Sequence, residues 1–274
     1  MSEHIRAEER RYPPGIYEVP QVEPVPVVLE EFGQQVSQRL HDVAQRTGTM
    51  PTIIAPLNGS VMPLYAVCRE WQRAGGCVED IAHQVHLVNT RKVGEAAECV
   101  ILTEEDPGEL AFVIEDIIDD GGTGEIIEKA YPETHFELHA PLSKVGKIET
   151  ARAKLPRTKV TTTRTVDNVW IVGGGGLDGG SMKLNGVHDY QNVELAVAAR
   201  LMDRYVYHNN DEVLPPYEEQ LRAFTAARLP WITPGSTIHM WMLRAEWAKM
   251  KGKVDVLQDL ASIFPYILQN EIGS

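Results

Sequence analysis

Cysteine is scarce in this sequence, and long apolar runs are missing. The chain has three cysteines, Cys68, Cys77 and Cys99, and no two of them have the C-x-x-C spacing of a zinc or redox site. Their odd number favours a reducing compartment over a disulfide framework. No run approaches the roughly 20 apolar residues of a membrane span, and the N-terminal residues lack the apolar core of a signal peptide. We therefore expect a cytoplasmic protein without a membrane partner.

Basic residues are also fewer than acidic ones. Asp and Glu number 39 against 26 Lys and Arg, which gives a formal net charge of −13. Nonspecific nucleic-acid binding requires a basic surface, so we expect no nucleic-acid partner. Hydrophobic residues make up 43% of the 274 residues and charged residues 24%, as in ordinary globular proteins. This length suits one large domain or one domain with an appendage.

Strand and helix patterns alternate along most of the chain. Strand patterns occur over Pro51–Ala55, Ile81–Val88, Val100–Leu102, Glu109–Ile114, Phe136–Ala140 and Val169–Val172, and helical patterns over Val28–Arg46, Val61–Trp71, Gly124–Ala130 and Tyr190–Tyr207. Alternation of this kind predicts an α/β fold, a twisted mainly parallel sheet with helices on both faces. The ligand loops of such a sheet gather at the carboxyl ends of its strands.

Three segments are expected. Residues 1–27 are polar and then proline-rich, which indicates an irregular N-terminal segment. Residues 28–207 form the α/β domain, and residues 208–274 form a helical C-terminal extension. Trp241 in that extension is more typical of helix packing than of base stacking.

The most informative stretch is Ala111–Lys129, AFVIEDIIDDGGTGEIIEK. An apolar strand leads into four carboxylates and three glycines, and a helical pattern follows. Glycines let backbone N–H groups converge, and a helix N-terminus adds partial positive charge, so a phosphate can bind there. Carboxylates beside a phosphate would repel a bare anion. The ligand should therefore also bring hydroxyls, a metal ion or a centre that becomes positive.

This stretch resembles the motif that binds 5-phosphoribosyl-1-pyrophosphate (PRPP) in type I phosphoribosyltransferases, particularly the hypoxanthine/guanine branch. The family pattern is an apolar strand, Glu-Asp, two apolar residues, Asp-Thr-Gly, one variable residue and Thr. The resemblance implies that Glu115 and Asp116 bind the ribose hydroxyls and that Asp119 is the general base. It also implies that the 5′-phosphate is held by N–H groups from Asp120 to Thr123 and by the Thr123 hydroxyl. These phosphate-binding residues are Asp120, Gly121, Gly122 and Thr123.

Asp120 departs from the family pattern, which usually has threonine there. A carboxylate about 4 Å from a phosphate costs on the order of 1 to 4 kcal/mol. Either Asp120 turns away and only its N–H contributes, or the pocket accepts something other than a simple 5′-monophosphate.

Further loops extend the resemblance. Asn58 and Gly59 lie in the turn that corresponds to the pyrophosphate loop, where the hypoxanthine branch commonly has Leu-Lys-Gly-Ser, so Asn58 replaces a lysine. Lys144 stands where a lysine binds the exocyclic oxygen of the purine. A surface lysine and an ordinary Asn-Gly turn are the simpler alternatives.

A late strand and glycine run complete the expected site. By resemblance, Trp170 or Ile171 flanks the base, and Asp178 is a ligand of the Mg²⁺ that accompanies pyrophosphate. Gly174, Gly176 and Gly179 also match G-x-G-x-x-G, a weak dinucleotide signal that no clear βαβ unit follows.

Two polar segments have alternative interpretations. Asn89–Ala97 matches the loop that closes over the family's active site, or it is a solvated hairpin tip. Residues 145–165 are basic and threonine-rich, and they form either a solvated face or mobile loop or a rim that attracts phosphate.

The function that we expect is Mg²⁺-dependent transfer of ribose 5-phosphate from PRPP to a purine-type base, with PRPP and a nucleobase as ligands. We also expect a homodimer or higher homo-oligomer. The alternatives are a non-catalytic PRPP or nucleotide sensor on the same fold, a transferase for a modified ribosyl donor or non-purine base, and an NAD(P)-binding oxidoreductase.

Overall fold

A computed structural model of the chain describes residues 25–57, 59–93, 96–103, 106–166, 236–250 and 252–273. The helices and strands in these ranges are α2 (Val25–Thr47), β1 (Thr52–Pro56), α3 (Val61–Arg73), α4 (Val78–Ala82), β2 (Val85–Val93), β3 (Ala96–Ile101), β4 (Leu110–Ile114), β5 (Ile117–Ile118), α5 (Gly122–Ala130), β6 (His135–Lys144), α6 (Lys147–Lys154), β7 (Thr158–Val166), α9 (Thr237–Met250) and α10 (Val254–Ile272).

The strands form one mainly parallel sheet. Its order is β3-β2-β1-β4-β6-β5, and the seventh strand, β7, pairs with β6. Every pairing is parallel except that of β2 with β3. The carboxyl ends of β1, β4 and β6 therefore lie along one edge of the sheet, where loops can meet.

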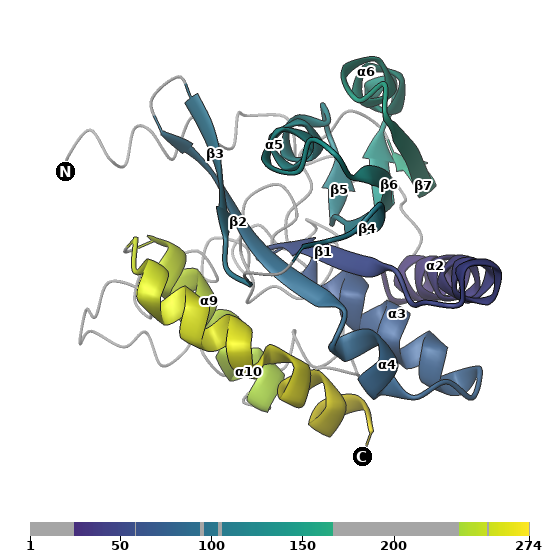
Figure 1. The fold of residues 1–274 in the computed structure, drawn as a ribbon, viewed down its shortest axis with the longest axis vertical. Helices are drawn as coiled ribbons and strands as arrows, with labels where there is room; N and C mark the ends of the chain where they lie inside the picture. Colours follow the sequence, from purple (N-terminus) through teal and green to yellow (C-terminus); the bar gives the residue numbers. More distant parts are fainter. Residues whose placement is uncertain are drawn as a thin grey trace, which may run out of the picture.

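Helices cover both faces of the sheet (Figure 1). Successive strand residues point to opposite faces, so Phe112 belongs to the hydrophobic core under α2, α3 and α4, and Val113 to the core under α5 and α6. The C-terminal helices enlarge the first core, because α10 packs on α3 and α4 and α9 packs on α10. The predicted fold class, including its helical C-terminal extension, is confirmed.

Trp241 lies inside the helical extension. Its side chain is buried, its ring centroid lies 4.5 Å from that of Phe264, and its indole N–H donates to the Leu260 carbonyl at 2.9 Å. The predicted role of Trp241 in helix packing is thus confirmed. None of the helices that the structure describes is long and apolar enough to span a membrane.

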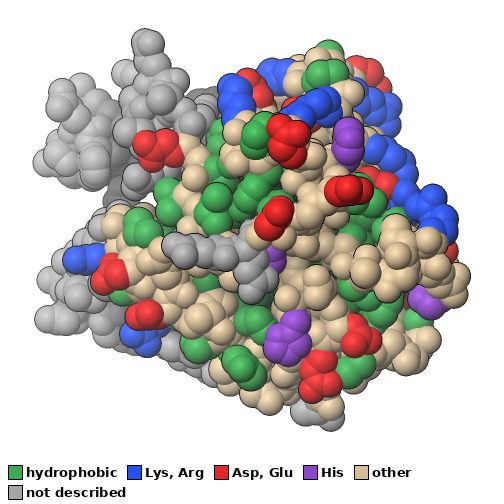
Figure 2. Space-filling model, in the orientation of Figure 1, with side chains coloured by type: hydrophobic (Ala, Val, Ile, Leu, Met, Phe, Trp, Pro, Cys, Tyr) green, Lys and Arg blue, Asp and Glu red, His purple; other side chains and the backbone are tan. Residues whose placement is uncertain are grey.

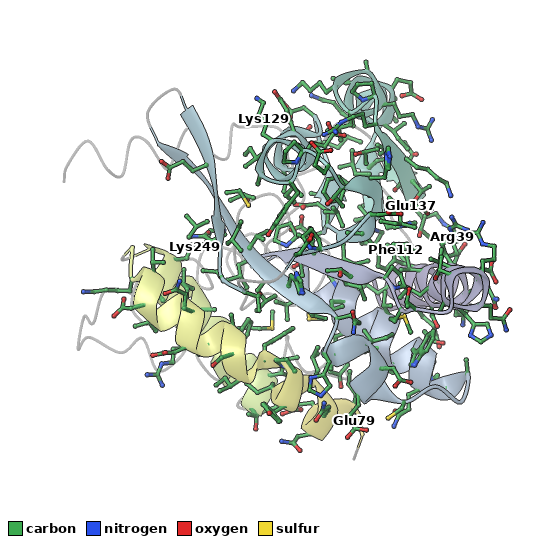
Figure 3. All side chains as sticks on the ribbon, in the orientation of Figure 1. Arg39, Glu79, Phe112, Lys129, Glu137 and Lys249 are labelled. Atoms are coloured by element: carbon green, nitrogen blue, oxygen red, sulfur yellow. The ribbon has the colours of Figure 1, made fainter. Side chains whose placement is uncertain are left out.

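A polar cluster fastens α2 to the sheet. Arg39 on α2 donates from both Nε and a terminal guanidinium nitrogen to Glu137 on β6, and Lys159 on β7 lies 3.3 Å from the same carboxylate. Burial opposes ionisation of Glu137, but the Arg39 hydrogen bond, helped by His139 and Lys159, holds its pKa well below the ordinary value. His139 stacks on Phe112 with ring centroids 5.0 Å apart, and burial lowers its pKa. Figure 3 labels Arg39, Glu137 and Phe112 in this cluster.

Several element boundaries differ from the sequence-based expectation. Helix α2 begins at Val25, before the expected start at Val28. Residues 78–82 are helical, so the expected strand Ile81–Val88 begins only at Val85. The expected polar loop Asn89–Ala97 is mostly strand, since β2 and β3 pair from Val88–Ile101 to Val93–Ala96. Residues 145–165 contain α6 and β7 rather than a loop, because β-branched threonines favour a strand. The expected strand Val169–Val172 and helix Tyr190–Tyr207 lie outside the described residues.

Candidate functional site

The acidic pair Glu115 and Asp116 occupies a break between two collinear strands. β4 and β5 both pair with β6, with Ile114 opposite His139 and Ile117 opposite Leu142. Between them, the Glu115 N–H donates to the His139 carbonyl, and the Asp116 carboxylate accepts the Ile117 N–H at 2.8 Å. Both carboxylates are therefore fixed at the carboxyl end of a buried central strand.

Glu115 is held in an environment that disfavours its charge. Its Oε2 atom is buried and has no hydrogen-bond partner in the described part of the chain. Burial raises the pKa of Glu115 well above the ordinary value, and the neighbouring charge of Asp116 raises it further, whereas Lys249 and a hydrogen bond with Thr123 act in the opposite direction. A buried carboxyl oxygen without a partner is suited to a ligand hydroxyl or a cation.

The turn after β1 lies directly against this pair. A Cβ atom on Gly59 would lie 2.1 Å from Asp116 Oδ2, so only glycine allows the approach. Ser60, the next residue, donates from its hydroxyl to the Pro56 carbonyl at 2.6 Å and is fully buried. The structure thus brings together the predicted pyrophosphate turn and the predicted ribose-binding pair.

The glycine loop that begins helix α5 also contacts the pair. Gly121 has a φ of 77°, the left-handed conformation that glycine adopts readily, and α5 starts at Gly122. A Cβ atom on Gly124 would lie 2.8 Å from Leu155 Cδ1, so the helix packs closely beside α6. Thr123 in the first turn interacts with Glu115, which connects the loop to the acidic pair.

Asp120 turns back onto its own loop. Its Oδ1 atom accepts the Gly122 N–H at 3.0 Å, and its Oδ2 atom lies 2.9 Å from Lys154 Nζ on α6. The Lys154 hydrogen bond lowers the pKa of Asp120, although burial opposes this. An ionised carboxylate therefore already accepts one of the backbone N–H groups that the sequence predicts for phosphate.

Asp119 and Lys144 also lie together. Lys144 Nζ is 3.7 Å from Asp119 Oδ2, and Lys147 Nζ is 3.3 Å from Asp119 Oδ1. The Lys144 side chain is 4% exposed and that of Asp119 is 48% exposed. Lys144 ends strand β6 rather than lying in a loop after it, so the surface-lysine alternative is wrong.

The 145–165 segment brings basic residues next to Asp119 and Asp120. Figure 2 shows Lys and Arg side chains gathered over α6 and β7. Lys147 and Lys154 from this segment pair with the motif aspartates Asp119 and Asp120. The segment is therefore folded against the motif and is not a mobile loop.

Sequence reasoning missed Lys249. This residue lies in the last turn of α9 and donates from Nζ to the Leu57 carbonyl, at 2.7 Å, in the turn after β1. The two residues are 192 positions apart in the chain, and no local motif marks Lys249. Asn58, Trp170, Ile171 and Asp178 lie outside the described residues.

The described residues contain no group of three or more His, Cys, Asp or Glu side chains arranged to hold a metal ion. Mg²⁺ needs fewer protein ligands, because it retains water molecules and is usually held by one or two carboxylates together with substrate phosphates. The buried Glu115 Oε2 and the adjacent Asp116 fit that donor set.

No model of a known protein family matches the chain. Among solved structures, a hypoxanthine phosphoribosyltransferase from Trypanosoma cruzi aligns with 62% of this chain and 92% of its own, at 16% identity and a TM-score of 0.46. A mutant of the T. cruzi enzyme in complex with its product IMP aligns with 61% of this chain and 89% of its own, at 15% identity and a TM-score of 0.43. A hypoxanthine-guanine phosphoribosyltransferase from Bacillus anthracis aligns with 54% of this chain and 83% of its own, at 19% identity and a TM-score of 0.37.

Proposed function

We propose that the protein is a Mg²⁺-dependent phosphoribosyltransferase that moves ribose 5-phosphate from PRPP to a purine-type base and releases pyrophosphate. The observation that carries the proposal is the contact of the acidic pair with two glycine loops. Asp116 touches Gly59 in the turn after β1, and Glu115 interacts with Thr123 in the loop before α5. A ligand with hydroxyls in its centre and phosphate groups at both ends suits this order of groups.

In the proposed reaction the bond from the anomeric carbon to pyrophosphate breaks, and a ring nitrogen of the base bonds to that carbon. The ring loses a proton, which Asp119 accepts. Lys144 and Lys147 orient the Asp119 carboxylate, and Lys144 also donates to the exocyclic oxygen of the base. The 3.7 Å between Lys144 and Asp119 supports this division of roles, because both groups can reach one bicyclic base.

Glu115 and Asp116 bind the ribose hydroxyls and would hold Mg²⁺, with Asp178 as the further ligand implied by the resemblance. When bound, Mg²⁺ neutralises the charge that develops on the departing pyrophosphate. Burial raises the pKa of Glu115, and a cation bound beside its carboxylate should lower that pKa again.

A second candidate is a PRPP or nucleotide sensor without catalytic activity. Asp120 favours it, because its carboxylate already accepts the Gly122 N–H and would hinder a 5′-phosphate there. The transferase remains our first choice, because Asp119 and Lys144 lie 3.7 Å apart, a separation that suits a proton acceptor and a base-binding donor.

The test is release of pyrophosphate from PRPP in the presence of Mg²⁺ and a panel of purine and pyrimidine bases. We expect turnover with a 6-oxopurine. Asp119→Asn should lower kcat at least a hundredfold, in keeping with the usual contribution of general base catalysis. The matched control is Asp259→Asn on the exposed side of α10, which should leave turnover unchanged. PRPP binding without turnover on any base would favour the sensor, and no PRPP binding would refute both.

A further inference from the structure

Lys249 places a positive charge from the C-terminal helices at the turn after the first strand. The residue is half-buried in the last turn of α9 (Figure 3), and its ammonium donates to the Leu57 carbonyl at 2.7 Å. A lysine in the last turn of a helix commonly interacts with the carbonyls of its own helix. Here the ammonium is instead directed across the molecule.

The turn that Lys249 reaches carries no charge of its own. Its sequence is Leu57-Asn58-Gly59-Ser60, and Gly59 contacts the carboxylate of Asp116. The charge of Lys249 also acts on the Glu115 carboxyl. An anionic ligand in this turn would therefore face two carboxylates, and Lys249 supplies a compensating charge from a helix far along the sequence.

Docking of α9 does not require this ammonium. The helix is already held by apolar side chains, since Trp241, Ala245 and Ala248 are buried and Trp241 packs on Phe264. Half-burying an ammonium costs free energy, and among the described residues Lys249 donates to the neutral Leu57 carbonyl, with the Glu115 carboxyl as a charged neighbour. An anion that entered the turn would add a second charged partner for this lysine.

We propose that Lys249 is an anion-binding residue of the site and contacts the diphosphate of the donor. This inference rests on the proposed function, because that function puts a diphosphate in the turn after β1. An ammonium has three N–H donors, and the Leu57 carbonyl takes one of them. The C-terminal extension thereby contributes a binding group as well as apolar surface.

The experiment measures binding of Mg²⁺-pyrophosphate and, separately, of ribose 5-phosphate by calorimetry. Lys249→Met should weaken pyrophosphate binding by about ten- to a hundredfold, the usual effect of losing a hydrogen bond to a charged group. The affinity of Lys249→Met for ribose 5-phosphate should not change, because that ligand lacks the diphosphate. Lys249→Arg should restore most of the pyrophosphate affinity.

The matched control is Lys253→Met, which removes the same charge from an exposed position just before α10 and should behave as wild type. The thermal midpoint of each variant reports on folding. Unchanged pyrophosphate binding in Lys249→Met, or equal loss of both ligands with a lowered midpoint, would overturn the proposal and make Lys249 a structural tether. Wild-type protein that binds neither ligand and releases no pyrophosphate from PRPP would refute the proposed function, and the role of Lys249 would fall with it.

Discussion

Neutralising Asp120 should strengthen binding of a sugar phosphate. The carboxylate accepts the Gly122 N–H at 3.0 Å, so a phosphate oxygen that approached the same N–H would lie roughly 4 Å from it. Two unit charges at 4 Å repel by about 1 kcal/mol at the dielectric constant of water and by about 4 kcal/mol at an effective value near 20. The Asp120 side chain is 56% exposed, so the lower end applies. We expect a gain of about fivefold in affinity.

Two substitutions separate the charge from the occupied N–H group. Asp120→Asn removes the charge and can still accept the Gly122 N–H through its amide oxygen, whereas Asp120→Ala leaves that N–H free for the ligand. Both should bind ribose 5-phosphate more tightly than wild type in calorimetric titrations at low salt, and the gain from Asn should shrink at high salt.

Lys154 needs its own control, because losing Asp120 leaves its ammonium free to attract phosphate. The double variant Asp120→Asn, Lys154→Gln removes both charges. If the double variant keeps most of the gain in ribose 5-phosphate affinity, repulsion by Asp120 causes the weak binding in wild type. If it keeps none, the gain in the single variants comes from the released Lys154 ammonium. Ribose 5-phosphate affinity unchanged in all three variants would refute the reasoning.

Two further predictions concern stability. The pKa of Glu115 is raised in the folded protein, so stability should fall as pH rises above its ordinary value of 4.5. Glu115→Gln should therefore gain stability relative to wild type in urea unfolding as pH rises from 4.5 to 7, and the gain should vanish near pH 4; a difference that does not vary with pH would contradict the assignment. The pKa of Glu137 is lowered, so its contribution is present above pH 4.5 and lost on acidification. Arg39→Met should cost about 3 kcal/mol at neutral pH and much less in acid, whereas breaking the exposed Lys129–Glu125 pair with Lys129→Met should cost under about 1 kcal/mol.

The sequence identified the elements that have strong local signals. The strand before Glu115, the strand before the Gly59 turn and the packing of Trp241 were all predictable, because apolar periodicity and glycine turns are local properties. Asp119 and Lys144 could be paired only through the family resemblance. Lys249 could not be found, since its partner lies 192 residues away.

Pro141 explains why the end of β6 was misjudged. A proline usually excludes a central strand, because it has no N–H to donate. Here β6 pairs with β4 as far as His139 and with β5 from Leu142, so Pro141 falls opposite the break that holds Glu115 and Asp116. The strand therefore continues to Lys144. One interruption in the sheet thus accommodates both the proline and the acidic pair, a coincidence that only the register reveals.

The contact between Lys249 and Leu57 also fixes when the site becomes complete during synthesis. Leu57 leaves the ribosome 192 residues before Lys249, which at roughly 5 to 20 residues per second corresponds to about 10 to 40 s. During this interval the turn after β1 lacks the Lys249 ammonium, and the apolar surface of α3 and α4 lacks its α10 cover. The nascent protein should therefore acquire its full affinity for a diphosphate only when α9 and α10 fold.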